Sequence, residues 1–139
     1  GYLVLNEALD LVFGADYVDR GDVKLLPVGG LIYHPNSHVR LELVFPHPRV
    51  DFQVENNCRL YFAGGLGGET WAVERDTFVD DLAIYRDLRV SVGLETGGDD
   101  CSWSALEIAY LFDRKFEFAS GNGGYRPDGT LMIRTVHCY

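Results

Sequence analysis

The sequence lacks several features on which common functional assignments rest. No apolar run approaches the roughly 18 to 20 residues that a transmembrane helix needs, which argues against a helical membrane protein. Basic residues are scarce, because 12 Lys and Arg stand against 21 Asp and Glu, and the formal net charge is −9. Phosphate binding needs a basic face, so the sequence also argues against a nucleic-acid partner.

The common motifs of enzymes, cofactor sites and metal sites are missing as well. The three cysteines form no CxxC, which argues against zinc and thioredoxin-like sites. The glycines at 64–68 are followed by neither GK[ST] nor a helix start, and no serine lies in a GxSxG context. The loop carboxylates lack EF-hand spacing. We therefore expect no enzymatic activity, no cofactor and no metal site.

What the sequence does contain is alternation of apolar and polar residues along almost its whole length. This period is typical of β-strands whose two faces meet different surroundings. The chain is also rich in glycine (16), tyrosine (8) and phenylalanine (8), which favours an all-β fold. Turn-forming stretches divide the alternation into about eight predicted strands, near residues 2–18, 23–33, 38–45, 49–55, 58–74, 82–95, 103–118 and 130–139.

We predict an all-β, antiparallel up-and-down meander in a single domain, residues 1–139, that forms a barrel or part of a larger barrel. A meander removes its exposed edges most simply by closing. An eight-strand barrel has an interior just wide enough for side chains or one small ligand. The alternation of Leu106, Ile108, Tyr110 and Phe112 is predicted to continue through Phe116 and Phe118.

Two orientations of the strands fit the alternation. In a soluble, lipocalin-like barrel that binds a small ligand, the apolar side chains point inward, whereas in a transmembrane barrel they point outward into lipid. Glu7, Arg86 and His137 share the apolar parity and favour the soluble form. Strand length favours the transmembrane form, and so do aromatic residues at both expected rims. These are Tyr2, Tyr33, Trp103 and Tyr139 at one rim, and Phe13, Tyr17, Phe45 and Phe118 at the other.

If the apolar residues face lipid, the charged residues of the other parity line the lumen and can pair there. A narrow barrel filled in this way is expected to conduct little. The predicted lumen network consists of Arg40, Arg59, Arg89, Glu42, Glu55, Glu95 and Glu107.

Strand counting places Cys58, Cys101 and Cys138 at the same rim. In an oxidising compartment a disulfide can form there, although three unpaired thiols also fit the sequence. Cys58 and Cys101 stand two strands apart, about 10 Å, a gap that a flexible loop at 96–101 can close. Cys58–Cys101 is therefore the first predicted pair, and Cys101–Cys138 is the second.

Several longer stretches carry a resemblance to a known family. They are LPVGGLIY, LVFPHPRV, GGETWAVER, YRDLRV and AYLFDRKFEF, followed by a final strand that ends in an aromatic residue. Together they resemble the C-terminal part of a family of uncharacterised bacterial proteins that are predicted to be outer-membrane β-barrels. The final strand departs from the usual outer-membrane ending, since Thr135 and His137 stand where apolar residues are expected.

The resemblance implies a non-enzymatic barrel with a structural or transport-related role. It implies a location in the outer membrane of a Gram-negative-type bacterium, with the lipid bilayer as partner. It also implies that further strands precede Gly1, which makes this chain the C-terminal portion of a longer one. A homo-oligomer is the other way in which such a barrel could be completed.

Overall fold

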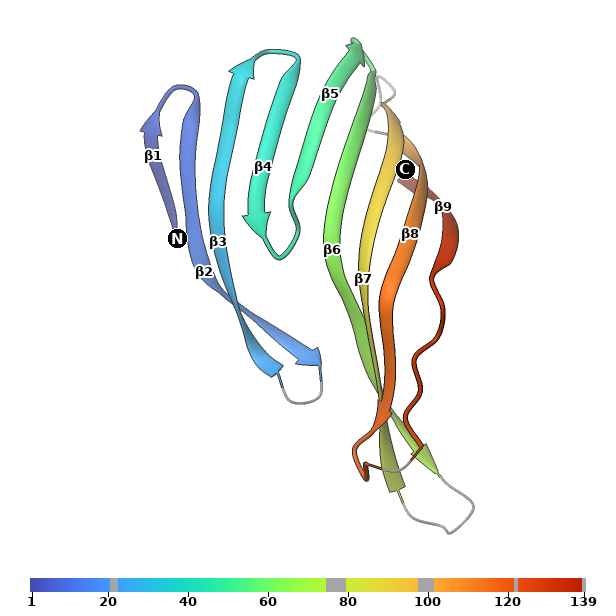
Figure 1. Cartoon of the computed structure of the whole chain (residues 1–139). Coiled ribbons are helices and arrows are strands. Elements are labelled where there is room, and N and C mark those ends of the chain that lie inside the picture. Colours follow the sequence, from blue (N-terminus) through green and yellow to red (C-terminus); the bar gives the residue numbers. More distant parts are fainter. Residues whose placement is uncertain (21–22, 75–79, 98–101, 122, 139) are drawn as a thin grey trace.

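The computed structural model describes residues 1–20, 23–74, 80–97, 102–121 and 123–138. These residues form one antiparallel sheet whose nine strands follow one another in chain order (Figure 1). The predicted antiparallel meander is thereby confirmed, as an open sheet with β1 and β9 at its two edges. The strands are β1 (Tyr2–Asn6), β2 (Leu9–Arg20), β3 (Val23–Asn36), β4 (Val39–Phe45), β5 (Arg49–Glu55), β6 (Cys58–Glu74), β7 (Asp80–Gly97), β8 (Trp103–Phe118) and β9 (Thr130–Cys138).

The additional strand arises from a tight turn within the stretch predicted as one strand, residues 2–18. The Asn6 side-chain oxygen accepts a hydrogen bond from the Ala8 backbone N–H at 2.9 Å, an arrangement that lets asparagine form a turn without glycine or proline. Leu3 faces Leu11 across the resulting hairpin. The apolar parity therefore resumes directly after the turn, with only Glu7 between Leu5 and Leu9, and alternation alone could not reveal it.

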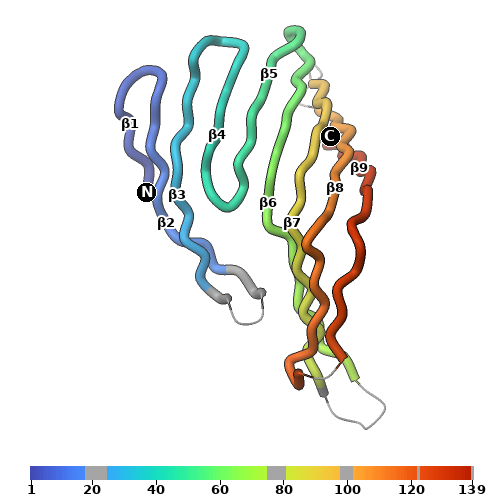
Figure 2. Tube along the Cα trace, in the orientation of Figure 1, coloured from blue at the N-terminus to red at the C-terminus, as the bar shows by residue number. Residues whose placement is uncertain are grey.

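The sheet curls into a trough with one concave and one convex face (Figure 1, Figure 2). Cα atoms of β2 lie within 8 Å of Cα atoms in β6 and β7, which are not its neighbours in the sheet. The short β4–β5 hairpin leaves the lower halves of β3 and β6 without a strand between them. We call the end with the β1–β2, β3–β4 and β5–β6 turns the upper rim, as it is drawn in Figure 1.

The convex face is apolar and exposed. Strand pairing sets Val50, Phe62, Val92, Ile108 and Ile133 side by side in one row across β5 to β9. Phe62 is 49% exposed, Ile108 46% and Ile133 72%. We call this surface, which β2 continues with Leu11 and Phe13, the apolar belt.

The concave face carries the buried polar side chains. The next row of paired residues is Asp51, Tyr61, Gly93, Glu107 and Arg134. Asp51 is only 5% exposed, Tyr61 4% and Glu107 6%. In a single-layer sheet, side chains become buried where curvature crowds them together, so the buried row lies on the inner side of the curve. The polar parity therefore faces inward in this structure.

A β-bulge at Asp113 divides β8 into two parts with opposite facing. Leu88 of β7 pairs with Phe112, but Arg86 pairs with Lys115, so β8 has one residue more than its partner between these pairs. Asp113 has the positive φ, 46°, that such a bulge can require. A shift of one residue turns every following side chain to the other face.

The bulge corrects the predicted continuous alternation through the end of β8. Phe116 and Phe118 lie on the concave side, with ring centroids 5.3 Å apart, and Tyr125 stacks on Phe116 at 5.2 Å. Lys115 and Glu117 form an ion pair at 2.7 Å on the convex side. The apolar belt on β8 is thus confined to Ser104–Phe112, which matches the length of a membrane-crossing strand, about 9 to 11 residues.

The predicted aromatic rims are correct only in part. Tyr2 faces the concave side, where its hydroxyl donates a hydrogen bond to Asp10, and Trp103 and Phe118 also face inward. The strand parity of Tyr2 and Trp103 differs from that of the belt, and Phe118 follows the bulge at Asp113. Four of the predicted aromatics do lie exposed on the convex face, namely Tyr33, Phe13, Tyr17 and Phe45. Tyr139 lies outside the described residues.

Candidate functional site on the concave face

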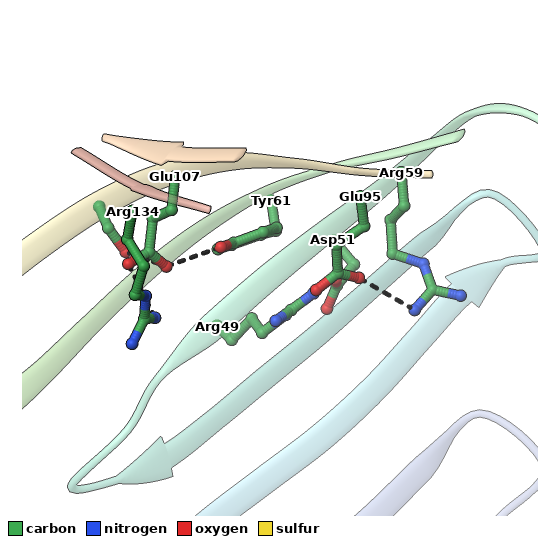
Figure 3. A network of polar contacts seen from close by, with 8 residues as sticks. Arg49, Asp51, Arg59, Tyr61, Glu95, Glu107 and Arg134 are labelled. Carbon is green, nitrogen blue, oxygen red and sulfur yellow. Dashed lines mark hydrogen bonds and ion pairs between the residues drawn. The ribbon is translucent and has the colours of Figure 1, made fainter. Parts of the chain in front are cut away.

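Glu107 of β8 is the centre of the concave polar network (Figure 3). Tyr61 of β6 donates its hydroxyl to Glu107 Oε2 at 2.6 Å, reaching across β7. Arg134 of β9 donates from Nη2 to Glu107 Oε1 at 2.9 Å. Ser91 Oγ adds a longer contact of 3.4 Å to Oε2. One carboxylate therefore joins β6, β7, β8 and β9 through side chains alone.

Arg49 extends the network across the concave face to β5. Its Nε and Nη2 donate to Asp51 Oδ1 at 2.9 and 2.7 Å, and Nη2 also donates to Glu95 Oε1 at 2.9 Å. The guanidinium carbon lies 4.0 Å from the centroid of the Tyr61 ring, a cation–π distance. Because Glu95 belongs to β7, Arg49 links β5 to β7 over β6.

Gly93 provides the space in which the Tyr61 ring lies. A Cβ atom at Gly93 would stand 2.2 Å from Tyr61 Cζ, far inside van der Waals contact. The ring lies over the backbone of β7 and can reach Glu107 because position 93 carries no side chain.

Gly93→Ala is expected to lower the free energy of unfolding by about 1–3 kcal/mol, because the methyl group displaces the Tyr61 ring. In a Tyr61→Ala background the same substitution is expected to be neutral or slightly stabilising, since alanine restricts the unfolded chain. Urea unfolding of the four variants in a double-mutant cycle measures the coupling. Equal costs of Gly93→Ala in both backgrounds would contradict this role of Tyr61.

A second ion pair lies lower on the concave face. Arg89 donates from Nε and Nη2 to the two Asp87 oxygens, each at 2.9 Å, and the Asp87 side chain is fully buried. A Cβ atom at Gly67, on the adjacent β6, would overlap both side chains. Like Gly93, Gly67 leaves room for side chains of the neighbouring strand.

All seven residues of the predicted lumen network line cavities on the concave side. Arg40 pairs with Glu42, Arg59 lies 3.9 Å from Glu95, and Glu107 pairs with Arg134. Arg89 pairs with Asp87 and with none of the predicted glutamates. Within the described residues, Glu55 makes no ion pair and remains exposed at the upper rim. The cavity-lining members are Arg40, Glu42, Glu55, Arg59 and Glu95 at the rim, and Arg89 and Glu107 below them.

The sequence-based network omitted the residues that bind its members together. Asp51 was recognisable from its polar parity, and Arg49 lies two residues before it on the same face. Tyr61 gave no signal, because its role depends on a glycine far away in sequence. The omitted residues are Arg49, Asp51, Tyr61, Asp87 and Arg134.

The rim cavity has a volume of about 580 Å³ and a polar lining. Half-exposed Arg40 and Arg59, exposed Glu55 and the indole of Trp103 border it. Such a lining suits water and small polar solutes. In the part of the chain that the structure describes, no group of three or more His, Cys, Asp or Glu could hold a metal ion.

Two of the three cysteines lie at the same end of the sheet. Cys58 pairs with Thr96 and Cys138 with Trp103, both at the upper rim, as the strand count predicts. These two cysteines are not bonded to each other. Cys101 lies outside the described residues, so the Cys58–Cys101 and Cys101–Cys138 pairings stay predictions.

Ser104 and His137 meet on the convex face near the upper rim. Ser104 Oγ lies 2.9 Å from His137 Nδ1 across the β8–β9 pair. A hydrolytic site needs a third group that orients the histidine, and no described residue hydrogen-bonds the other ring nitrogen. The Ser104 hydroxyl and His137 Nδ1 hydrogen-bond each other at the end of the apolar belt.

The strands alone carry the architecture, and among the described residues no helix is long and apolar enough to cross a membrane. In comparisons of this chain with family models, with curated proteins and with solved structures, nothing matches.

Proposed function

We propose that this chain forms the wall of a non-enzymatic outer-membrane β-barrel with a structural or transport-related role. The observation that carries the proposal is the inverted distribution of side chains over the two faces. Ile108 and Phe62 are about half exposed on the convex face, while Asp51 and Glu107 are buried on the concave one. A transmembrane barrel has this arrangement, with apolar residues toward lipid and polar residues toward the lumen.

The soluble, lipocalin-like alternative requires the opposite distribution. Its apolar parity must line the interior and its charged parity must meet water. In water, the apolar belt would form a contiguous exposed patch over many strands, far larger than the few hundred Å² that soluble monomers usually tolerate. The facing of the described residues therefore favours lipid as the surrounding medium.

The three polar residues that share the apolar parity lie at the ends of the belt. Glu7 belongs to the β1–β2 turn, and His137 lies next to the last residue of β9. Arg86 pairs with Gly68 and Lys115, below the bulge at Asp113. Charged side chains at the bilayer midplane cost about 2–4 kcal/mol, but near the interface they cost only about 0–1 kcal/mol. Their positions are compatible with a membrane.

The connections between strands suggest an orientation in the outer membrane. Three upper-rim turns have only two residues between their strands, namely Glu7–Ala8, Ser37–His38 and Asn56–Asn57. At the opposite end, residues 119–129 connect β8 to β9. Bacterial outer-membrane barrels have short periplasmic turns and longer extracellular loops. We therefore assign the upper rim to the periplasmic side.

Cell fractionation tests the proposal. The protein is expected in the membrane pellet after high-salt and alkaline washes, and detergent is expected to release it. Both results follow if the apolar belt contacts lipid. Recovery of the folded protein from the soluble fraction without detergent would refute the membrane assignment.

A further inference from the structure

The two edges of the sheet, β1 and β9, carry a constraint on how the barrel closes. Every neighbouring pair from β1 to β9 is antiparallel, so strand direction alternates along the sheet. With nine strands, the first and the last run in the same direction, toward the upper rim (Figure 1). A direct β1–β9 seam would therefore be a parallel pair, unlike every other pair in the sheet.

An open edge is costly in the environment proposed above. The lipid core offers no water to hydrogen-bond backbone N–H and C=O groups. Each unsatisfied group therefore costs on the order of several kcal/mol. Bacterial single-chain outer-membrane barrels contain an even number of strands, which makes every seam antiparallel. Among the described residues, β1 and β9 each pair with one strand only.

A second copy of the chain does not remove the problem. Two copies in one bilayer share the same orientation, so β9 of one copy would meet β1 of the other. Those strands are again parallel, for the same reason. An odd number of inserted strands is what gives antiparallel partners to both edges.

Resting on the proposed function, we infer that an odd number of additional antiparallel β-strands, apolar outward and polar inward, joins β9 to β1. These strands come either from another segment of the polypeptide or from a different protein. The alternation of apolar and polar side chains along β1 and β9 sets the pattern that the additional strands must match. β9 presents Leu131 and Ile133 outward and Arg134 inward, and β1 presents Leu3 outward and Tyr2 inward.

Arg134 indicates the chemistry of the strand beside β9. Its side chain is 53% exposed although Nη2 donates to Glu107. A guanidinium has five N–H donors, so most of them remain available at this edge. The adjoining strand is therefore expected to place a carboxylate or another acceptor on its inward face, beside Arg134.

Photo-crosslinking in cells that express the intact protein tests this closure. The photoreactive amino acid p-benzoylphenylalanine replaces Leu5 on β1, which is 50% exposed, or Thr135 on β9, which lies on the convex parity. The control site is Phe62, whose sheet neighbours are Val50 and Val92. After irradiation, mass spectrometry identifies the peptides joined to each site, and membrane pelleting of the same cells reports on the proposed function separately.

We expect adducts from both edge sites to strands outside β1–β9, and adducts from Phe62 to β5 and β7 alone. A cross-link between positions 5 and 135 of one chain would mean a parallel nine-strand closure and would overturn the inference. The same cross-link between two differently tagged copies would overturn it in favour of a homo-oligomer. Unreacted edge sites beside a reactive Phe62 would show unpaired edges and would also overturn it.

Discussion

Val90→Arg is expected to lower the free energy of unfolding in lipid vesicles by about 2–4 kcal/mol. Val90 lies on the convex face near the middle of the apolar belt, where it is 50% exposed and pairs with Tyr110. An arginine at this position must place its charge in the hydrocarbon region. Urea titration of the protein refolded into vesicles measures the change.

Val54→Arg is the matched control. Val54 follows the belt residue Val50 on β5 and is 61% exposed, but it adjoins the upper-rim turn at Asn56. The same substitution is expected to cost only about 0–1 kcal/mol there, since the charge reaches the interface. If water surrounded the convex face, both substitutions would have similar and small effects, within about 0.5 kcal/mol. That outcome would contradict a lipid-facing belt.

Glu107→Ala is expected to destabilise the fold by about 2 kcal/mol, as estimated for a buried donor left without its acceptor. The substitution removes the acceptor of the buried Tyr61 hydroxyl, which hydrogen-bonds no other described residue, and it also removes the partner of Arg134. Arg134 is half exposed and can turn toward water, so the loss of its ion pair with Glu107 costs less than the loss of the Tyr61 hydrogen bond. Urea titration measures the effect. The folded fraction at each urea concentration is read from the electrophoretic mobility, which changes when the protein is unfolded by heating.

Glu55→Ala provides the comparison for Glu107→Ala. Glu55 carries the same charge on the same side of the sheet, but it is exposed and forms no ion pair with a described residue. Its removal is expected to change stability by less than about 0.5 kcal/mol. Equal effects of the two substitutions would mean that the Glu107 network is not a source of stability.

The strand boundaries from β4 to β9 could be predicted from the sequence because turn residues interrupt the alternation there. The predicted strand 49–55 coincides with β5, and 58–74 coincides with β6. The facing of the strands could not be predicted, because lipid and a dry core select the same alternation. The curvature of the folded sheet was needed to tell the two faces apart.

The remaining errors have local physical causes. The turn at Asn6 uses a side-chain hydrogen bond in place of glycine or proline, and the bulge at Asp113 inserts one residue into an otherwise regular pattern. Each interrupts the apolar parity at a single position only, at Glu7 and at Arg114. The contact of Tyr61 with Glu107 depends on strand register, which places Gly93 between them. Such a three-strand arrangement has no local signature in the sequence.

The most direct test of the central claim is a nitroxide scan along β8 in lipid vesicles, from residue 104 to residue 118. Single labels are placed in a chain without native cysteines, and the accessibility of each label to oxygen and to a water-soluble nickel complex is measured. Oxygen access is expected at positions 106, 108, 110 and 112, with low access at the odd positions between them, and a reversal of phase with access to nickel after Asp113. Nickel access at the even positions from 106 to 112 would show that water covers the convex face, and would contradict the membrane assignment.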